Sequence, residues 1–175
     1  AGHLVGRVSP AEVLELAALL AATETDPSVW RRIASATGEL VRLAGPEHDA
    51  PIRAAIVELG VPALARFAGI AEPTDNELDV RGVIVAMLGV GGRHAETRAR
   101  ARTVVEQGDA DAALTVAAIA VVAATATAEE HAELERRWRT ASTPQEELRY
   151  LTALVDTDDP ALFDRSLQLA VDEVR

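Results

Sequence analysis

Helix-start signals recur along almost the whole sequence, and they limit the possible folds more than any other feature. In each of them an oxygen-bearing side chain can accept a hydrogen bond from a free amide of the first turn, and several place proline where its missing N–H costs nothing. They lie at Ser9-Pro10-Ala11-Glu12, Asp26-Pro27, Thr74-x-x-Glu77, Thr127-x-x-Glu130, Thr143-Pro144-x-Glu146 and Asp159-Pro160. No convincing strand or hairpin pattern accompanies them, so the sequence predicts an all-α fold.

The first two helices can be placed from these signals and from the apolar spacing. The first begins at Pro10, and its apolar residues recur at i, i+3, i+4 and i+7, which predicts one buried stripe. That stripe consists of Val13, Leu16, Ala17 and Leu20. The second helix begins at Pro27 and is predicted to end at Gly45, in the left-handed conformation of a helix stop.

The middle of the chain is less regular. Between residues 46 and 70, Gly60-Val61-Pro62 interrupts a helical pattern, which predicts either two short helices or one kinked helix. The next helix is predicted to run from Thr74 to about Leu88, where Gly89, Gly91 and Gly92 would end it. The remaining expected helices cover residues 94–107, with a stop at Gly108, and 111–124, and begin near residues 127, 144 and 160.

These helices are spaced like a repeat. Every second one begins near residue 10, 46, 75, 111 or 144. Two antiparallel helices in a period of about 30–45 residues are typical of HEAT-like and tetratricopeptide-like solenoids. The Trp/Gly/Tyr pattern of tetratricopeptides is missing. We therefore expect residues 1–175 to form a single HEAT/armadillo-like α-α superhelix of about nine or ten antiparallel helices.

Composition excludes several classes of partner and site. The net charge of −11 repels phosphate backbones and anionic lipid, so we expect neither nucleic acid nor a membrane as a partner. The longest uncharged apolar stretch, residues 112–124, is shorter than the roughly 20 residues that span a bilayer. Without cysteine there is no disulfide, thiolate metal site or Cys nucleophile. Because no targeting segment is visible, we expect a cytoplasmic protein, and the Ala- and Arg-rich, Lys-free composition suggests a bacterial source.

No catalytic constellation emerges from the sequence. The four histidines, His3, His48, His94 and His131, do not lie within a helical turn of one another, and there is no H-E-x-x-H. His131 shares a helix face with Leu134 and Trp138, so we predict a partly buried histidine with satisfied hydrogen bonds. The glycines after Leu88 follow a helix and lack a Lys, so they are not a phosphate loop. We assign no catalytic, cofactor-binding or metal-binding residue.

Two further groups of residues are given structural interpretations. Arg98, Arg100 and Arg102 form a short basic cluster in which only the first and last share a helix face. This favours a solvated surface over an anion site. Trp30 and Trp138 are predicted to be core anchors between helix layers.

Four segments, taken in order, resemble a known family. They are Glu24-Thr-Asp-x-x-Val-Trp30, Asp75-Asn-Glu-Leu78, Thr143-Pro-x-Glu-x-x-x-x-Leu-x-Ala-Leu154 and Asp159-Pro-x-Leu162. Their order and spacing, across most of residues 9–175, are similar to those of the C-terminal helical domain of the aminopeptidase N family of zinc metallopeptidases, the type found in endoplasmic-reticulum aminopeptidases and their bacterial relatives.

The resemblance implies a helical superhelix that walls the substrate chamber of a zinc aminopeptidase. The family's zinc helix, its downstream Glu ligand and its G-x-M-E-N substrate loop belong to a catalytic domain upstream, so none of these residues can be placed on this chain. We therefore expect a fragment of a larger C-terminal domain that is inactive by itself. Its partners would be the zinc-containing catalytic domain of the same polypeptide and peptide substrates.

Two other functions remain open. The chain could be a free-standing HEAT-like scaffold that binds a protein along its concave face. An independent enzyme is the least favoured reading, because no site of the required kind is visible. An H-E-x-x-H in the reading frame upstream of Ala1 would distinguish the first reading from the scaffold.

Overall fold

The computed structural model describes residues 8–173, and this part of the chain is built from helices without a strand. The all-α prediction is confirmed. The helices are α1 (Pro10–Ala21), α2 (Pro27–Leu43), α3 (Pro46–Ala68), α4 (Asp75–Ala86), α5 (Ala95–Gln107), α6 (Ala112–Ala124), α7 (Ala128–Arg139), α8 (Pro144–Val155) and α9 (Pro160–Asp172), with a π-helical turn, η2 (Met87–Gly91), directly after α4.

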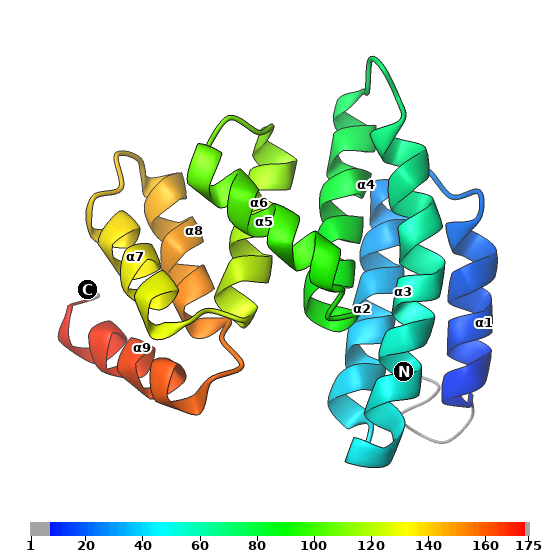
Figure 1. The fold of residues 1–175 in the computed structure, drawn as a ribbon, viewed down its shortest axis with the longest axis horizontal. Coiled ribbons are helices and arrows are strands. Elements are labelled where there is room, and N and C mark those ends of the chain that lie inside the picture. The colour runs from blue at the N-terminus through cyan, green and yellow to red at the C-terminus, as the bar shows by residue number, and fades with distance from the viewer. Residues whose placement is uncertain (1–7, 174–175) are drawn as a thin grey trace.

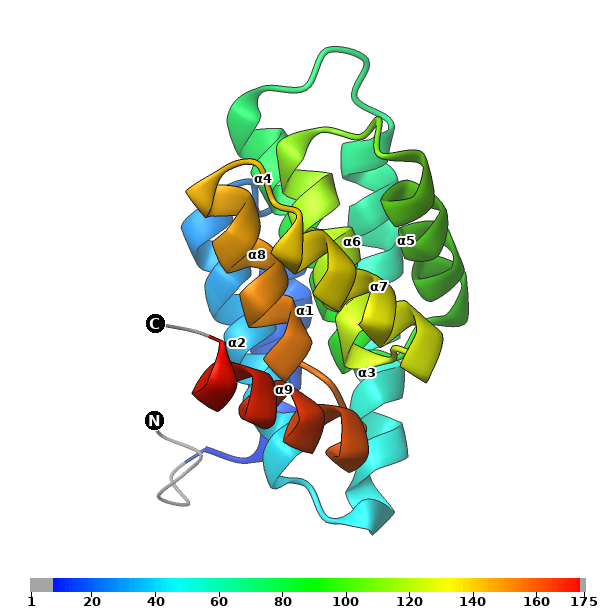
Figure 2. The same ribbon diagram turned by 90° about the vertical axis from the view of Figure 1, so that its left-hand side faces the viewer.

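The helices follow one another across the molecule in chain order. Figure 1 shows α1 to α4 at one side, α5 and α6 in the centre, and α7 to α9 at the other side. Figure 2, turned by 90°, places α7, α8 and α9 in front of the longer α2 and α3. The closest pairs are α4 with α6, α5 with α6, and α7 with α8. This arrangement fits the expected α-α superhelix.

Within residues 8–173, no single helix has both the length and the apolar composition needed to cross a membrane. One pair, α5 and α6, meets that test only when taken together, and it is bent by 117°.

The predicted helix starts are confirmed to within a residue, and most of them are fixed by a side-chain hydrogen bond to a first-turn amide; α3 and α5 begin without such a bond. Reciprocal capping boxes join Ser9 to Glu12, Thr74 to Glu77 and Thr127 to Glu130. Asp26, Asp111 and Asp159 accept bonds from the first-turn amides of α2, α6 and α9. These bonds involve residues two or three apart, so they need no tertiary structure to form.

Segment 46–70 forms one continuous helix, α3, although Pro51 and Pro62 lie inside it. Its buried residues keep helical spacing on both sides of Pro62, so packing outweighs the lost hydrogen bond. They are Ile52, Ile56, Leu59, Ala63 and Phe67. The predicted left-handed stop at Gly45 is wrong: Gly45 is extended, with φ −68° and ψ 164°, and is the N-cap of α3.

The three glycines predicted to end the next helix do so only in part: Gly92 ends it, but Gly89 and Gly91 do not. The chain continues through Gly89 in the π-helical turn η2 and leaves the helix only at Gly92. A Cβ on Gly89 would lie 2.4 Å from a methyl carbon of Val121 on α6. A Cβ on Gly82 of α4 would likewise lie 2.9 Å from the carbonyl oxygen of Ala113. Glycine is therefore needed here for the close approach of α4 and α6 and not as a stop.

The predicted stripe of α1 is only partly buried. Of its four residues, Ala17 is buried and Val13 is partly buried, but Leu16 is 58% exposed and Leu20 is 36% exposed. Leu19, outside the stripe, is 74% exposed. Helix α1 contacts α2 and α3 and lies at the edge of the molecule. An edge helix has partners on one side only, so the larger leucines on its outer side stay uncovered.

Trp30 is confirmed as a core anchor. It is completely buried, meets the Phe67 ring edge-on with 6.4 Å between centroids, and donates from Nε1 to the carbonyl of Glu24 at 3.1 Å. The guanidinium of Arg66 lies over the same Phe67 ring and donates to that Glu24 carbonyl at 2.7 Å. The segment from Glu24 to Trp30 therefore joins α1, α2 and α3.

Candidate functional site

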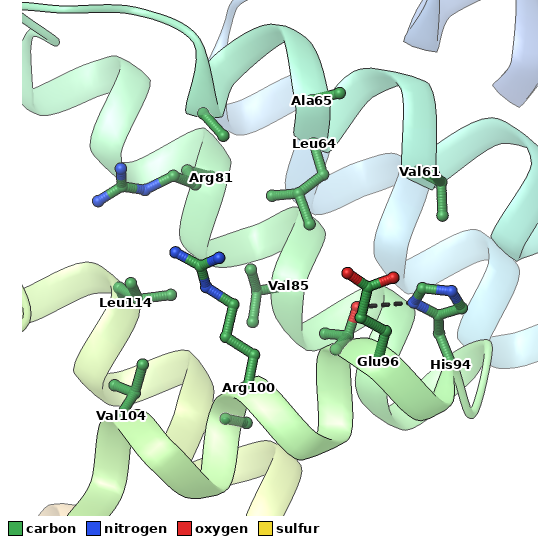
Figure 3. A pocket seen from close by; sticks show the side chains of 13 residues that line it. Val61, Leu64, Ala65, Arg81, Val85, His94, Glu96, Arg100, Val104 and Leu114 are labelled. Carbon is green, nitrogen blue, oxygen red and sulfur yellow. Dashed lines mark hydrogen bonds between the residues drawn. The ribbon is translucent and has the colours of Figure 1, made fainter. Parts of the chain in front are cut away.

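A pocket of about 280 Å³ lies between α3, α4, α5 and α6 (Figure 3). Its walls are largely aliphatic. The larger of these side chains are Val61, Leu64, Val85, Val104 and Leu114. Its polar residues are Arg81 on α4, His94 at the start of α5, and Glu96, Thr97 and Arg100 on α5.

The polar groups are separated by sign. Figure 3 shows the Arg81 and Arg100 guanidinium groups at one end of the pocket, and Glu96 with His94 at the other. Helix α5 sets this order, because Glu96 and Arg100 are one turn apart and share a face. Thr97 and Ala101, on the neighbouring face, are buried and hold α5 against the molecule.

The two arginines differ in their partners. Arg81 forms an ion pair with Asp111, the N-cap residue of α6, and both side chains are mostly buried. The Nε of Arg81 is buried without a hydrogen-bond partner in the described residues. Neither Arg100 nor Glu96 has an ion-pair or hydrogen-bond partner within residues 8–173. The two unpaired groups face a pocket that already contains a fixed cation.

The residues that line this pocket are suited to binding a ligand. The Nδ1 of His94 lies 2.9 Å from the hydroxyl of Thr97, but these are the N-cap and N3 residues of α5, so the contact belongs to the helix start. Over residues 8–173, no group of three or more His, Cys, Asp or Glu side chains is placed to hold a metal ion. A cationic end, an anionic group and an apolar wall are what this pocket offers a ligand.

A second hollow, between α1 and α3, has a volume of about 540 Å³ but is more open. Its arginine, Arg66, donates to carbonyls of the segment after α1, including those of Ala21 and Glu24. The cationic group of this hollow is thus engaged in the fold, and its other charged residues are two carboxylates, Glu15 and Glu58.

The predicted solvated surface at the basic cluster is wrong for two of its three members. Arg98 donates from Nε to the carbonyl of Gly89 at 2.7 Å, and Arg102 donates from Nε to Glu130 at 2.6 Å. Burial, with the nearby Arg93, lowers the pKa of Arg98, and the hydrogen bond to Glu130 raises the pKa of Arg102. The third member, Arg100, lines the pocket. The spacing of Glu96 and Arg100 could have suggested a surface pair, but only the tertiary structure adds Arg81.

His131 lies in a different place, the core between α7, α8 and α9. It is 1% exposed, so the predicted partial burial is wrong in degree. Its Nε2 is 2.9 Å from the Ser166 hydroxyl and 3.3 Å from the carbonyl oxygen of Leu154. Its Nδ1 is buried and has no partner in the described part of the chain, so only one of its two nitrogens is satisfied. Leu134 and Trp138 are buried beside it, which confirms the shared face.

The sequence was compared with models of protein families and with curated proteins. Residues 2–175 match the sequence model of the family described as ERAP1-like C-terminal domain. The matched range includes all nine helices of the described residues and the four segments that carry the resemblance. No curated protein matches the chain.

Proposed function

The chain belongs to the ERAP1-like C-terminal domain family, and from this premise we propose that it shapes and covers the peptide chamber of a zinc aminopeptidase. Membership implies a domain of an aminopeptidase-type protein. The finer proposal is that the parent protein removes N-terminal residues from peptides while this domain limits which peptides enter. The observation that carries it is the match over residues 2–175.

The surface of the chain supports a place within a larger assembly. Besides the outer leucines of α1, the last helix α9 exposes Phe163, Leu167 and Val171 on one side, Val171 to 84%. Exposed apolar faces of this kind mark contacts with other proteins or domains. We propose that the catalytic domain of the same polypeptide covers at least one of them.

The helix pairs are tied together in a way that suits a chamber wall. Arg31 of α2 pairs with Asp79 of α4 at 2.9 Å, and Arg102 of α5 pairs with Glu130 of α7. Each of these ion pairs joins helices that are not consecutive in the chain. Zinc and the catalytic groups would be supplied by the catalytic domain, and the chain would work in the cytoplasm.

The test begins with the reading frame upstream of Ala1, where an H-E-x-x-H is expected. The parent protein is then compared with a form that lacks this domain, using peptides of increasing length and a single-residue aminoacyl reporter. We expect the dependence of kcat/KM on peptide length to be lost while reporter cleavage persists. An unchanged length dependence, or an upstream frame without the zinc motif, would favour the free-standing interaction scaffold.

A further inference from the structure

We propose that the pocket between α3, α4, α5 and α6 binds a free apolar α-amino acid. The α-carbon of such a ligand carries three groups: a carboxylate, an ammonium group and an aliphatic side chain. The pocket presents the complement of all three: arginines at one end, a carboxylate at the other and aliphatic walls between them. The link to peptide cleavage, whose product is an amino acid, rests on the proposed function, but the binding itself does not.

The cationic end fits the ligand's carboxylate. Arg100 is unpaired within the described residues, and its guanidinium points towards Arg81 (Figure 3). Because Arg81 is already neutralised by Asp111, this end of the pocket keeps one net positive charge. A carboxylate placed there would form charge-assisted hydrogen bonds, and the planar fork of Arg100 can donate two of them in parallel.

The opposite end fits the ligand's ammonium group. Glu96 lies one helical turn before Arg100, so the two side chains start about 5–6 Å apart at their Cβ atoms. A pair with this spacing commonly closes into an ion pair, yet here no bond joins the two side chains. The two exposed side chains flank the pocket separately, and we place the short amino acid backbone between them.

The walls fit an aliphatic side chain. Leu64, Val85, Val104 and Leu114 face the pocket from four different helices, and Val85 is buried. A volume of about 280 Å³ is at the lower limit of the roughly 300–1,000 Å³ found for drug-sized ligands, so the space suits a smaller molecule. Leucine, isoleucine and valine are the natural candidates.

Charge arithmetic separates a free amino acid from the end of a peptide. Glu96 and Arg100 contribute opposite charges, and the Arg81–Asp111 pair contributes none. A zwitterion therefore leaves the pocket neutral with both unpaired groups satisfied. A peptide C-terminus would leave Glu96 without a partner, and a peptide N-terminus would leave Arg100 without one.

The test is calorimetric titration of the chain with L-leucine, N-acetyl-L-leucine and L-leucinamide. The second ligand lacks the ammonium group and the third lacks the carboxylate. We expect saturable binding of L-leucine and binding of each analogue weaker by at least about tenfold, the loss that accompanies removal of one charge-assisted contact. Arg100→Ala and Glu96→Gln should each weaken the binding of L-leucine by a similar factor. Both side chains lack a hydrogen bond or ion pair within the described residues, so the fold should tolerate either change.

The variants also carry a signature that a structural role would not produce. Glu96→Gln should no longer discriminate against N-acetyl-L-leucine, and Arg100→Ala should no longer discriminate against L-leucinamide. Arg32→Ala and Glu72→Gln are matched controls, because both residues are exposed and neither lines the pocket, and both variants should bind L-leucine like the unaltered chain.

Three results would overturn the proposal. They are the absence of saturable L-leucine binding at millimolar concentration, equal binding of N-acetyl-L-leucine, and unchanged affinity in both pocket variants. Equal binding of the acetylated ligand would assign the pocket to carboxylates in general. None of these results would alter the dependence of cleavage on peptide length, so this proposal and the proposed function can fail separately.

Discussion

The two ends of the molecule are stabilised in different ways. Helices α1 to α4 enclose a cluster that is apolar at its centre, with Trp30, Ile56, Ile84 and Leu88 fully covered. The core between helices α7, α8 and α9 contains three buried polar residues, His131, Glu135 and Ser166. The stability of the first end therefore comes mainly from buried apolar side chains. The stability of the second end also requires hydrogen bonds and ion pairs between buried polar side chains.

The polar end is tied together through Glu135. Its carboxylate is 5% exposed and pairs with Arg139 of its own helix and with Arg165 of α9, the latter at 2.8 Å. Arg139 also pairs with Glu173 at 2.8 Å. Burial opposes ionisation of Glu135, but its hydrogen bonds with Arg139 and Arg165 outweigh this and lower its pKa. The attachment of α9 therefore depends on a buried charge, whereas α2 and α3 are held mainly by the apolar cluster that they share with α1 and α4.

The largest effect is expected from Trp30→Ala at the apolar end. Removing a fully buried aromatic side chain costs about 3–5 kcal/mol, a large part of the 5–15 kcal/mol that stabilises a domain. We expect a Tm lowered by about 10 °C, or an insoluble chain, in a thermal melt. Leu19→Ala on the exposed face of α1 is the control and should melt like the unaltered chain. An unchanged midpoint for Trp30→Ala would show that Trp30 is a contact residue instead of an anchor.

The next effect is expected from Glu135→Gln at the polar end. The amide keeps the shape of the side chain but removes the charge that faces two arginines, which should cost about 1–3 kcal/mol. Hydrogen exchange should show loss of protection in α9 and the facing part of α7, with α1 to α4 unaffected. Glu147→Gln, on the exposed side of α8, is the matched control. Equal loss of protection at both ends would mean that the two ends unfold as one unit.

Lowering the pH should destabilise the end formed by α7 to α9 before the end formed by α1 to α4. A carboxyl group whose pKa is lowered by folding adds stability above its unfolded value of about 4.5, and that stability is lost as the pH falls through the lower folded value. Lowered pKa values at the other end belong to groups such as Glu12 and Glu77, whose carboxylates cap helices, and Asp49, which pairs with Arg53 one turn along the same helix. None of these three carboxylates joins two helices through an ion pair, as Glu135 does.

Hydrogen exchange from pH 7 to below pH 4.5 should therefore show α9 losing protection before α2 and α3. In Glu135→Gln the difference between the two ends should depend much less on pH. Earlier loss at the apolar end would contradict the assignment of Glu135 as the main acid-sensitive tie.

The sequence predicted features that depend on residues close together in the chain and missed those that depend on contacts between distant segments. Helix starts such as Ser9 and Thr127 were correct because a cap bonds to an amide three residues away. The stop predicted at Gly89 was wrong because this position needs glycine to leave room for Val121 of α6, and no local sequence pattern carries that information. Leu16 was wrong for a similar reason, since being at the edge of the molecule is a property of the whole fold.

The same distinction applies to the candidate pocket. Glu96 and Arg100 are visible in the sequence as a helical pair, but a pair alone indicates only a solvated surface. The pocket exists because α4 brings Arg81 beside α5 and because α3 and α6 supply its apolar walls. Those contacts join segments far apart in the chain, so composition and periodicity could not predict them.

The smallest effect is expected from Ser166→Ala, which tests the polar core at a single hydroxyl. Ser166 donates to the carbonyl of Leu154 at 2.5 Å, so its oxygen must accept from the Nε2–H of His131. Without the hydroxyl, Nε2 keeps only the carbonyl of Leu154, 3.3 Å away. We expect a loss of about 1 kcal/mol and a Tm lower by about 2–4 °C.

The matched control for this change is Ser35→Ala on the exposed side of α2, which should remain within about 0.5 kcal/mol of the unaltered chain. Exchange protection should fall in α9 alone, because Ser166 is the buried residue of that helix. If Ser166→Ala melts like Ser35→Ala, the Leu154 carbonyl is a sufficient partner for His131. The polar end would then depend on Glu135 and its arginines alone, and its sensitivity to acid would be the property that distinguishes it from the apolar end.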